Sequence, residues 1–110
     1  MAYDEGLAQL IRDDLTEVAG IAEKKMFGGL CFLLHGHMVA GVHKGGGMFR
    51  VGKAAEPQAR AIDGAGPMDF TGRPMRGMVN ATDDLMVDDT RRTVLLGLAL
   101  THAKSLPPKG

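Results

Sequence analysis

The sequence contains four histidines, and their side chains could serve a function because a neutral imidazole is a common metal ligand. His37 and His43 alternate onto one face of a predicted strand, but the strand separates them by roughly 20 Å. His35 and His37 flank a predicted turn and could form a weak surface chelate, yet no third ligand is evident. We therefore predict no resident metal, and we keep a metal or small ligand at His35 and His37 as the alternative.

Cys31 and His102 are candidates for catalysis by residue type alone. Cys31 lies between Leu30 and Phe32 in an apolar run, which predicts a buried and unreactive thiol. His102 falls on the apolar stripe of the last predicted helix, as is typical of a histidine at the edge of a core. Since no nucleophile and general base are placed together, the sequence predicts no catalytic residue, no cofactor and no enzyme.

The most distinctive segment spans residues 70–77 and reads Phe-Thr-Gly-Arg-Pro-Met-Arg-Gly. Its two arginines, Arg73 and Arg76, lie in a predicted loop bounded by glycines, where they could bind an anion or an acidic partner. The same arginines could equally pair with Asp69 and with helix termini. We take Arg73 and Arg76 as the first candidates for a partner or anion contact.

Two strong helices are predicted to frame these residues, one near each end of the chain. The first spans residues 4–18, and its apolar face has five members: Leu7, Leu10, Ile11, Leu15 and Val18. The last begins at residue 88 or 89 and ends near 105, before two prolines. Its predicted stripe is Arg91, Leu95, Leu98, Ala99, His102 and Leu106.

Between these helices the pattern changes to strands and turns. Strands are predicted over 26–34, 37–43 and 48–53, joined at His35-Gly36 and at a glycine-rich loop. A short helix over 54–62, a loop over 63–74 and a fourth strand over 75–80 follow. The sequence thus predicts an α+β fold in a single domain, residues 1–110. Its expected form is an antiparallel β-meander packed by the N- and C-terminal helices in two layers.

The hairpin at His35-Gly36 assigns side chains to the two faces of the sheet, because alternate residues of a strand point to opposite sides. With Leu34 paired to His37, one face is the predicted core: Phe27, Cys31, Leu33, Met38, Ala40, Val42, Phe49 and Val51. The other face is mixed: Leu30, Phe32, Leu34, His37, Val39, His43, Met48 and Arg50. A one-residue register error would exchange these assignments.

The mixed face is too apolar to be left in water, and so we predict a contact surface there, for a protein partner or for self-association. Phe32 and Arg50 are its candidate contact residues. The alternative is that the segment 54–62, or the loop after it, folds over this face as ordinary core.

Composition restricts the kind of partner. The 110 residues include 13 Lys and Arg against 13 Asp and Glu, so the formal net charge is zero. Because an excess of cationic charge drives binding to nucleic acid, no specific nucleic-acid binding is expected of this domain. There is one cysteine, no signal-peptide pattern and no apolar run as long as a membrane span. We therefore expect a cytoplasmic protein without membrane contact.

Several motifs extend in order over nearly the whole chain. They are Glu23-Lys24-Lys25-Met26-Phe27-Gly28-Gly29, Phe32, Met38, Gly41-Val42, Arg50-Val51-Gly52, Pro67-Met68-Asp69-Phe70-Thr71-Gly72-Arg73-Pro74-Met75-Arg76-Gly77 and Ser105-Leu106-Pro107-Pro108-Lys109. Together they resemble the N-terminal domain of the TfoX/Sxy family. The Lys-Lys-Met-Phe-Gly-Gly run and the Gly-Arg-Pro-Met loop are the most specific of these matches.

The resemblance implies an α+β sandwich like that of secretion chaperones. Name-giving members are bacterial regulators of natural competence for DNA uptake, and they carry a second, C-terminal helical domain as the stronger candidate for nucleic-acid contact. This chain is similar to their first half only. The resemblance therefore implies a stand-alone, non-enzymatic module for regulation or protein interaction, and no catalytic residues carry over. The turn at residues 35–37 is His-Gly-His, where asparagines are expected in many relatives.

Overall fold

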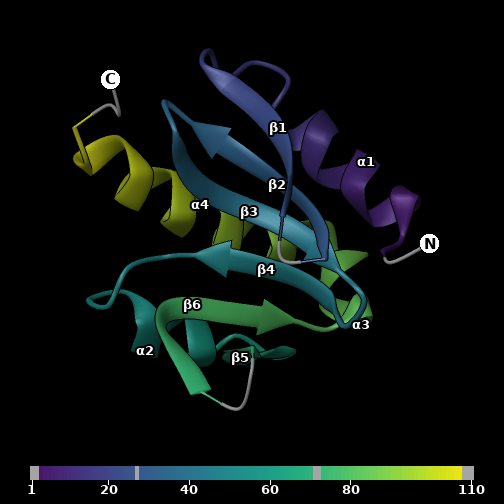
Figure 1. The fold of residues 1–110 in the computed structure, drawn as a ribbon. Coiled ribbons are helices and arrows are strands. Elements are labelled where there is room, and N and C mark those ends of the chain that lie inside the picture. The colour runs from purple at the N-terminus through teal and green to yellow at the C-terminus, as the bar shows by residue number, and fades with distance from the viewer. Residues whose placement is uncertain (1–2, 27, 71–72, 108–110) are drawn as a thin grey trace.

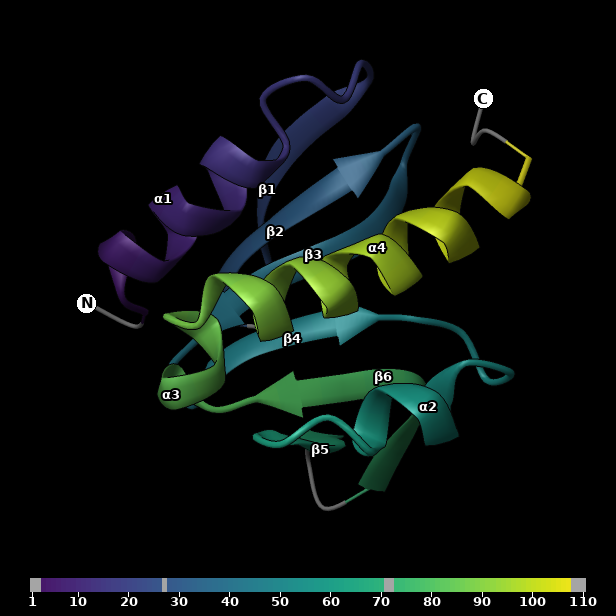
Figure 2. The same cartoon turned by 180° about the vertical axis from the view of Figure 1, so that it is seen from behind.

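The computed structural model describes residues 3–26, 28–70 and 73–107, except for the side chains of residues 69, 70, 73 and 74. Within that part of the chain, helices cover one face of an antiparallel sheet (Figure 1, Figure 2). The strands are β1 (Ile21–Met26), β2 (Gly29–Leu34), β3 (His37–His43), β4 (Gly46–Arg50), β5 (Ala65–Phe70) and β6 (Arg73–Ala81). The helices are α1 (Glu5–Asp14), α2 (Glu56–Arg60), α3 (Asp83–Met86) and α4 (Asp89–Ser105). The predicted α+β fold is confirmed.

The six strands lie in the order β1-β2-β3-β4-β6-β5. The first four are consecutive and antiparallel. β2, β3 and β4 form the three-stranded meander that the sequence predicts, and β1 extends it. β6 then pairs with β4, so the chain between them crosses the helical side as α2 and returns through the edge strand β5. Figure 2 shows α4 running across β3 and β4, with α1 on one side of it and α2 on the other. This order brings the end of β4, α2 and β6 together.

Both edge strands were absent from the sequence prediction. β1 carries Glu23, Lys24 and Lys25, all exposed, and such a polar segment has no apolar pattern to reveal a strand. The charges suit an edge because they discourage pairing with another chain. β5 occupies part of the predicted loop over 63–74 and contains Pro67. Proline is tolerated there because an edge strand leaves backbone N–H groups unpaired on one side.

A β-bulge explains where the predicted register was wrong. Leu34 pairs with His37 as predicted, but the register shifts at Phe32, which pairs with Ala40 and not with Val39. A bulge places one extra residue in one strand, so every pair beyond it moves by one position. The next hairpin is also tighter than predicted, because His43 pairs with Gly46.

The shifted register exchanges the two faces of β2 relative to the prediction. The helix-covered core includes nine strand residues and Val51, which follows β4: Leu30, Phe32, Leu34, Val39, Ala40, Val42, Phe49, Val51, Val79 and Ala81. The opposite face, which we call the methionine face, is centred on Cys31, Met38, Met48, Met68 and Met78, and all five are buried. Phe32 is fully buried among the helices, so the expected contact at Phe32 was wrong. β2 is apolar on both faces, and no alternation in its sequence could reveal the exchange.

The two main helices follow from their caps and apolar positions. Asp4 accepts hydrogen bonds from the Gly6 and Leu7 N–H groups and begins α1, which ends at Asp14, before the predicted Val18. The span of α4 agrees with the prediction, but its buried stripe is rotated: Arg92, Leu95, Leu96, Ala99 and Ala103. No helix among the described residues is long and apolar enough to cross a membrane.

Arg92 joins three of the helices. Its side chain is 4% exposed, and its Nε donates to Oδ2 of Asp14, the last residue of α1, at 2.7 Å. One terminal nitrogen donates to the Met86 carbonyl oxygen at 2.8 Å, and the other to Asp89 Oδ1 at 2.8 Å. A buried guanidinium needs this many acceptors, because an unpaired charge in the interior is strongly unfavourable.

Candidate functional site

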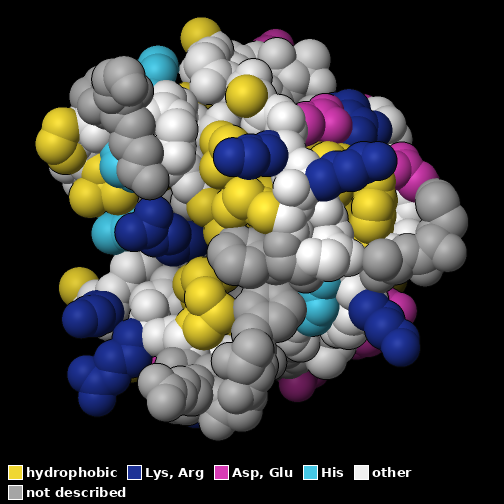
Figure 3. All heavy atoms as spheres, viewed as in Figure 1, with side chains coloured by type: hydrophobic (Ala, Val, Ile, Leu, Met, Phe, Trp, Pro, Cys, Tyr) yellow, Lys and Arg dark blue, Asp and Glu magenta, His cyan; other side chains and the backbone are white. Residues whose placement is uncertain are grey.

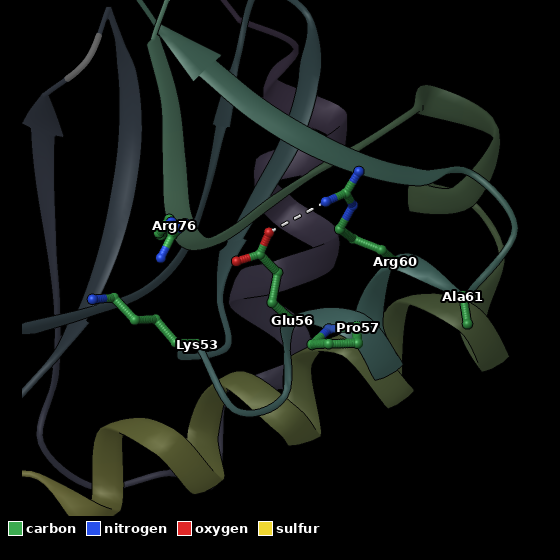
Figure 4. Close-up of a pocket in the computed structure, with 6 residues that line it drawn as sticks. All are labelled: Lys53, Glu56, Pro57, Arg60, Ala61 and Arg76. Atoms are coloured by element: carbon green, nitrogen blue, oxygen red, sulfur yellow. Dashed lines mark ion pairs between the residues drawn. The ribbon is translucent and has the colours of Figure 1, made fainter.

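An open hollow of about 780 Å³ lies between α2, β6 and the segment that follows β4 (Figure 4). Its lining residues are Lys53, Glu56, Pro57, Arg60, Ala61 and Arg76. We call it the cationic hollow, because half of the lining side chains are lysine or arginine. In the space-filling view, Lys and Arg side chains gather at this edge of the molecule, beside α2 (Figure 3).

Backbone hydrogen bonds hold the elements of the cationic hollow together. The N–H groups of Val51 and Gly52 both donate to the Gly77 carbonyl oxygen, at 2.8 and 3.0 Å. The Gly77 N–H donates in turn to Glu56 Oε1 at 2.8 Å. Gly77 has a φ of +83°, and a Cβ there would lie 3.2 Å from the Lys53 nitrogen. Glycine at this position therefore lets β6 approach the segment that carries Lys53.

Positive charge exceeds negative charge in the cationic hollow. Arg60 Nη1 lies 3.5 Å from Glu56 Oε2 in an i,i+4 pair. Lys53 and Arg76 are exposed, and no carboxylate among the described side chains pairs with them. Figure 4 shows both on one side of Glu56, with Arg60 on the other. Three cations against one carboxylate leave an excess of two positive charges, which suits carboxylate or phosphate groups of a ligand.

A second, more apolar depression of about 490 Å³ adjoins the first, between α4 and the chain before α2. Its lining residues are Val51, Gly52, Lys53, Ala54, Ala55, Gln58, Leu98, Thr101, His102 and Ser105. We call it the apolar groove. Lys53 lines both the apolar groove and the cationic hollow, so the two are neighbours on the surface.

His102 forms one wall of the apolar groove. Burial lowers the pKa of His102, and the positive charge of Arg50 and the nearby His37 lower it further. The imidazole is therefore neutral at pH 7. Gly52 has a φ of +87°, and a Cβ there would lie 2.5 Å from His102 Nδ1, so the ring packs directly against the Gly52 backbone.

The structure places three of the four predicted contact side chains, and they lie apart from one another. Arg76 lines the cationic hollow. Arg50 ends β4 on the methionine face, outside the hollow, and its charge acts on His102. Arg73 belongs to β6, but its side chain lies outside the described residues. Phe32 is buried in the core.

Sequence reasoning missed Lys53 and Arg60 as members of the site. Glu56 and Arg60 have the i,i+4 spacing of a helical ion pair, and Lys53 is the last residue of a predicted strand. These patterns predict the helix or strand to which each residue belongs, but they do not predict that the residues lie close together. What joins them to Arg76 is the pairing of β4 with β6, two strands that are not consecutive in sequence.

The predicted histidine pair has other contacts. His37 is buried, and its Nε2–H donates to the Pro107 carbonyl oxygen at 2.6 Å. His35 lies in the β2–β3 turn with a φ of +50°, and its ring is beside Gly20. Within the described part of the chain, no three histidine, cysteine or acidic side chains gather as metal ligands would. The alternative of a metal at His35 and His37 gains no support.

Cys31 is buried, as the sequence predicts, although it lies on the methionine face and not beneath the helices. Burial raises the pKa of its thiol to about 11. The reactive thiolate is therefore scarce at neutral pH, and the group packs as a small apolar side chain.

The family model of the TfoX N-terminal domain matches residues 13–103, most of the chain. The chain belongs to the TfoX N-terminal domain family. Comparison with curated proteins and with solved structures gave no significant match. The matched range includes Lys53, Arg60 and Arg76, so the cationic hollow lies within the family domain.

Proposed function

We propose that this domain is a non-enzymatic regulatory module that binds a protein partner, and that the cationic hollow receives an acidic segment of that partner. The observation that carries the proposal is the convergence onto one open surface of Lys53 from the segment after β4, Arg60 from α2 and Arg76 from β6. Membership in the TfoX N-terminal domain family supports a regulatory role. We assign the module to the cytoplasm, where a single unpaired cysteine is ordinary.

The groups around the cationic hollow suit binding more than catalysis. Lysine and arginine are charged at neutral pH, and they recognise carboxylates without any change of protonation. Glu56 is occupied by the Gly77 N–H and by Arg60, which leaves it a poor general base. A zero net charge gives little long-range attraction for nucleic acid, whereas a local excess of two charges suits a short acidic segment.

Affinity capture from the native host tests the proposal with three forms of the full chain. The first is wild type, the second carries Arg60→Glu and Arg76→Glu, and the third is a matched control with Lys24→Glu and Lys25→Glu. The control residues are exposed on β1, at the edge of the sheet farthest from β5 and β6. All three forms should have the same circular dichroism and thermal midpoint, because the substituted side chains are exposed.

We expect wild type and control to capture the same partner, and the Arg60/Arg76 variant to capture at least about tenfold less of it. The captured protein should bind the domain through an acidic segment. Equal capture by all three folded forms would contradict the proposed role of the cationic hollow.

A further inference from the structure

We propose that the partner's segment is apolar as well as acidic, with its carboxylates in the cationic hollow and a neighbouring aliphatic or aromatic side chain in the apolar groove. This inference rests on the proposed function, since it specifies the ligand of the same surface. Its basis is the shared residue Lys53, which lines both depressions. A peptide crossing Lys53 reaches both of them.

The apolar groove has walls that an apolar side chain would match. Val51, Ala55 and Leu98 contribute aliphatic surface, and Leu98 is only partly buried against the core. The neutral ring of His102 closes one side. A concave, mostly apolar site with a few polar groups at its margin is the usual form of a binding pocket.

Charge complementarity selects an acidic ligand for the apolar groove as well. None of its lining residues is acidic, and its charged member, Lys53, points its ammonium group toward the side of Arg76 (Figure 4). Long lysine side chains expose apolar stems while their charged ends remain in water. Lys53 can therefore contact an apolar residue with its stem and the adjacent carboxylate with its ammonium group.

The open form of the cationic hollow favours a peptide over a free anion. Ion pairs that remain exposed to water contribute little to affinity, because solvent and salt screen them. Burial of an apolar side chain next to the ion pairs supplies the missing affinity, and it also fixes the position of the acidic groups. A peptide with both features uses the whole surface, whereas inorganic phosphate would use only part of it.

A displayed library of random 12-residue peptides tests the inference on the full chain. Binders are selected on wild type and counter-selected on the Arg60→Glu/Arg76→Glu variant. We expect the enriched sequences to combine at least two acidic residues with a leucine, isoleucine, methionine or aromatic residue at a fixed spacing.

Two groove variants then locate the apolar contact. Thr101→Trp and Gln58→Trp each place a large side chain into the groove from an exposed position, so the fold should be retained. Each substitution should weaken the binding of a selected peptide at least about tenfold. An analogue of that peptide with serine in place of its apolar residue should bind more weakly to wild type, and neither groove substitution should change its affinity.

The outcomes separate this inference from the proposed function. Enrichment of acidic peptides without a fixed apolar residue, or indifference to both groove variants, would contradict the inference and leave the proposed function standing. No charge-dependent enrichment at all would contradict both. If no peptide were enriched and a labelled DNA duplex bound wild type but not the Arg60/Arg76 variant, the ligand of the cationic hollow would be nucleic acid. That result would also contradict both proposals.

Discussion

His102 is a side chain whose protonation depends on the fold. Its ring packs against the Gly52 backbone at the wall of the apolar groove, and burial with the charge of Arg50 lowers its pKa. An unfolded chain has a histidine with an ordinary pKa of about 6.5. The folded protein therefore binds fewer protons than the unfolded chain as the pH falls through this range.

That difference predicts a pH dependence of stability. Because the unfolded state binds more protons, the contribution of His102 is fully present well above pH ~6.5 and is lost as the pH falls toward the lowered pKa. Urea denaturation between about pH 5 and 7.5 should show a steeper loss for wild type than for His102→Gln. If the free energy of unfolding varied with pH equally in the two proteins, the lowered pKa of His102 would be contradicted.

Arg50→Gln should raise the pKa of His102 in an NMR titration of its ring, because it removes a nearby positive charge.

At the scale of helices and strands, Arg92 is the clearest link between elements. It contacts Asp14, the last residue of α1, as well as the last residue of α3 and the first residue of α4. Arg92 and Arg91 are adjacent in sequence, yet Arg91 lies at the surface among Asp63, Asp84 and Asp88. The buried face of α4 is rotated relative to the predicted stripe, and so Arg92 is buried where the prediction placed Arg91.

Removal of Arg92 should therefore be costly. Arg92→Met leaves Asp14 without its buried partner and should lower the free energy of unfolding by about 3–5 kcal/mol. Arg12→Met is the matched control, because the Arg12–Glu23 pair has side chains 35% and 38% exposed. The control should lower the free energy by less than about 1 kcal/mol. Comparable effects of the two substitutions in urea denaturation would contradict the structural role of Arg92.

The success of sequence prediction also varied by element. The span of α4 was predictable because Asp88 caps it and two prolines follow it. β3 was predictable because turn residues bound it on both sides. The face of β2 was not, since one bulge exchanges its sides and its sequence is apolar throughout. Edge strands β1 and β5 were missed because charged residues, glycine and proline, which suit an edge, are poor strand signals.

At the scale of the whole molecule, a zero net charge conceals an uneven distribution. Lys53, Arg60 and Arg76 gather beside α2, whereas Asp63, Asp84 and Asp88 gather around Arg91 near α3. The cationic hollow exists because β6 pairs with β4 and carries Arg76 to the segment after β4. Arg76 was predictable as a candidate from its loop, but its neighbours follow from strand order, which local sequence does not encode.

The central claim is that acidic groups bind in the cationic hollow. Its most direct test is an NMR titration of the ¹⁵N-labelled full chain with a short polyglutamate peptide, followed through the backbone amides. We predict saturable shifts at Lys53, Arg60 and Gly77 that weaken as salt is added, with little change at Lys24 and Lys25 on β1. Shifts at Lys24 and Lys25 as large as those around the hollow, or no shift at Lys53, Arg60 and Gly77, would contradict the claim.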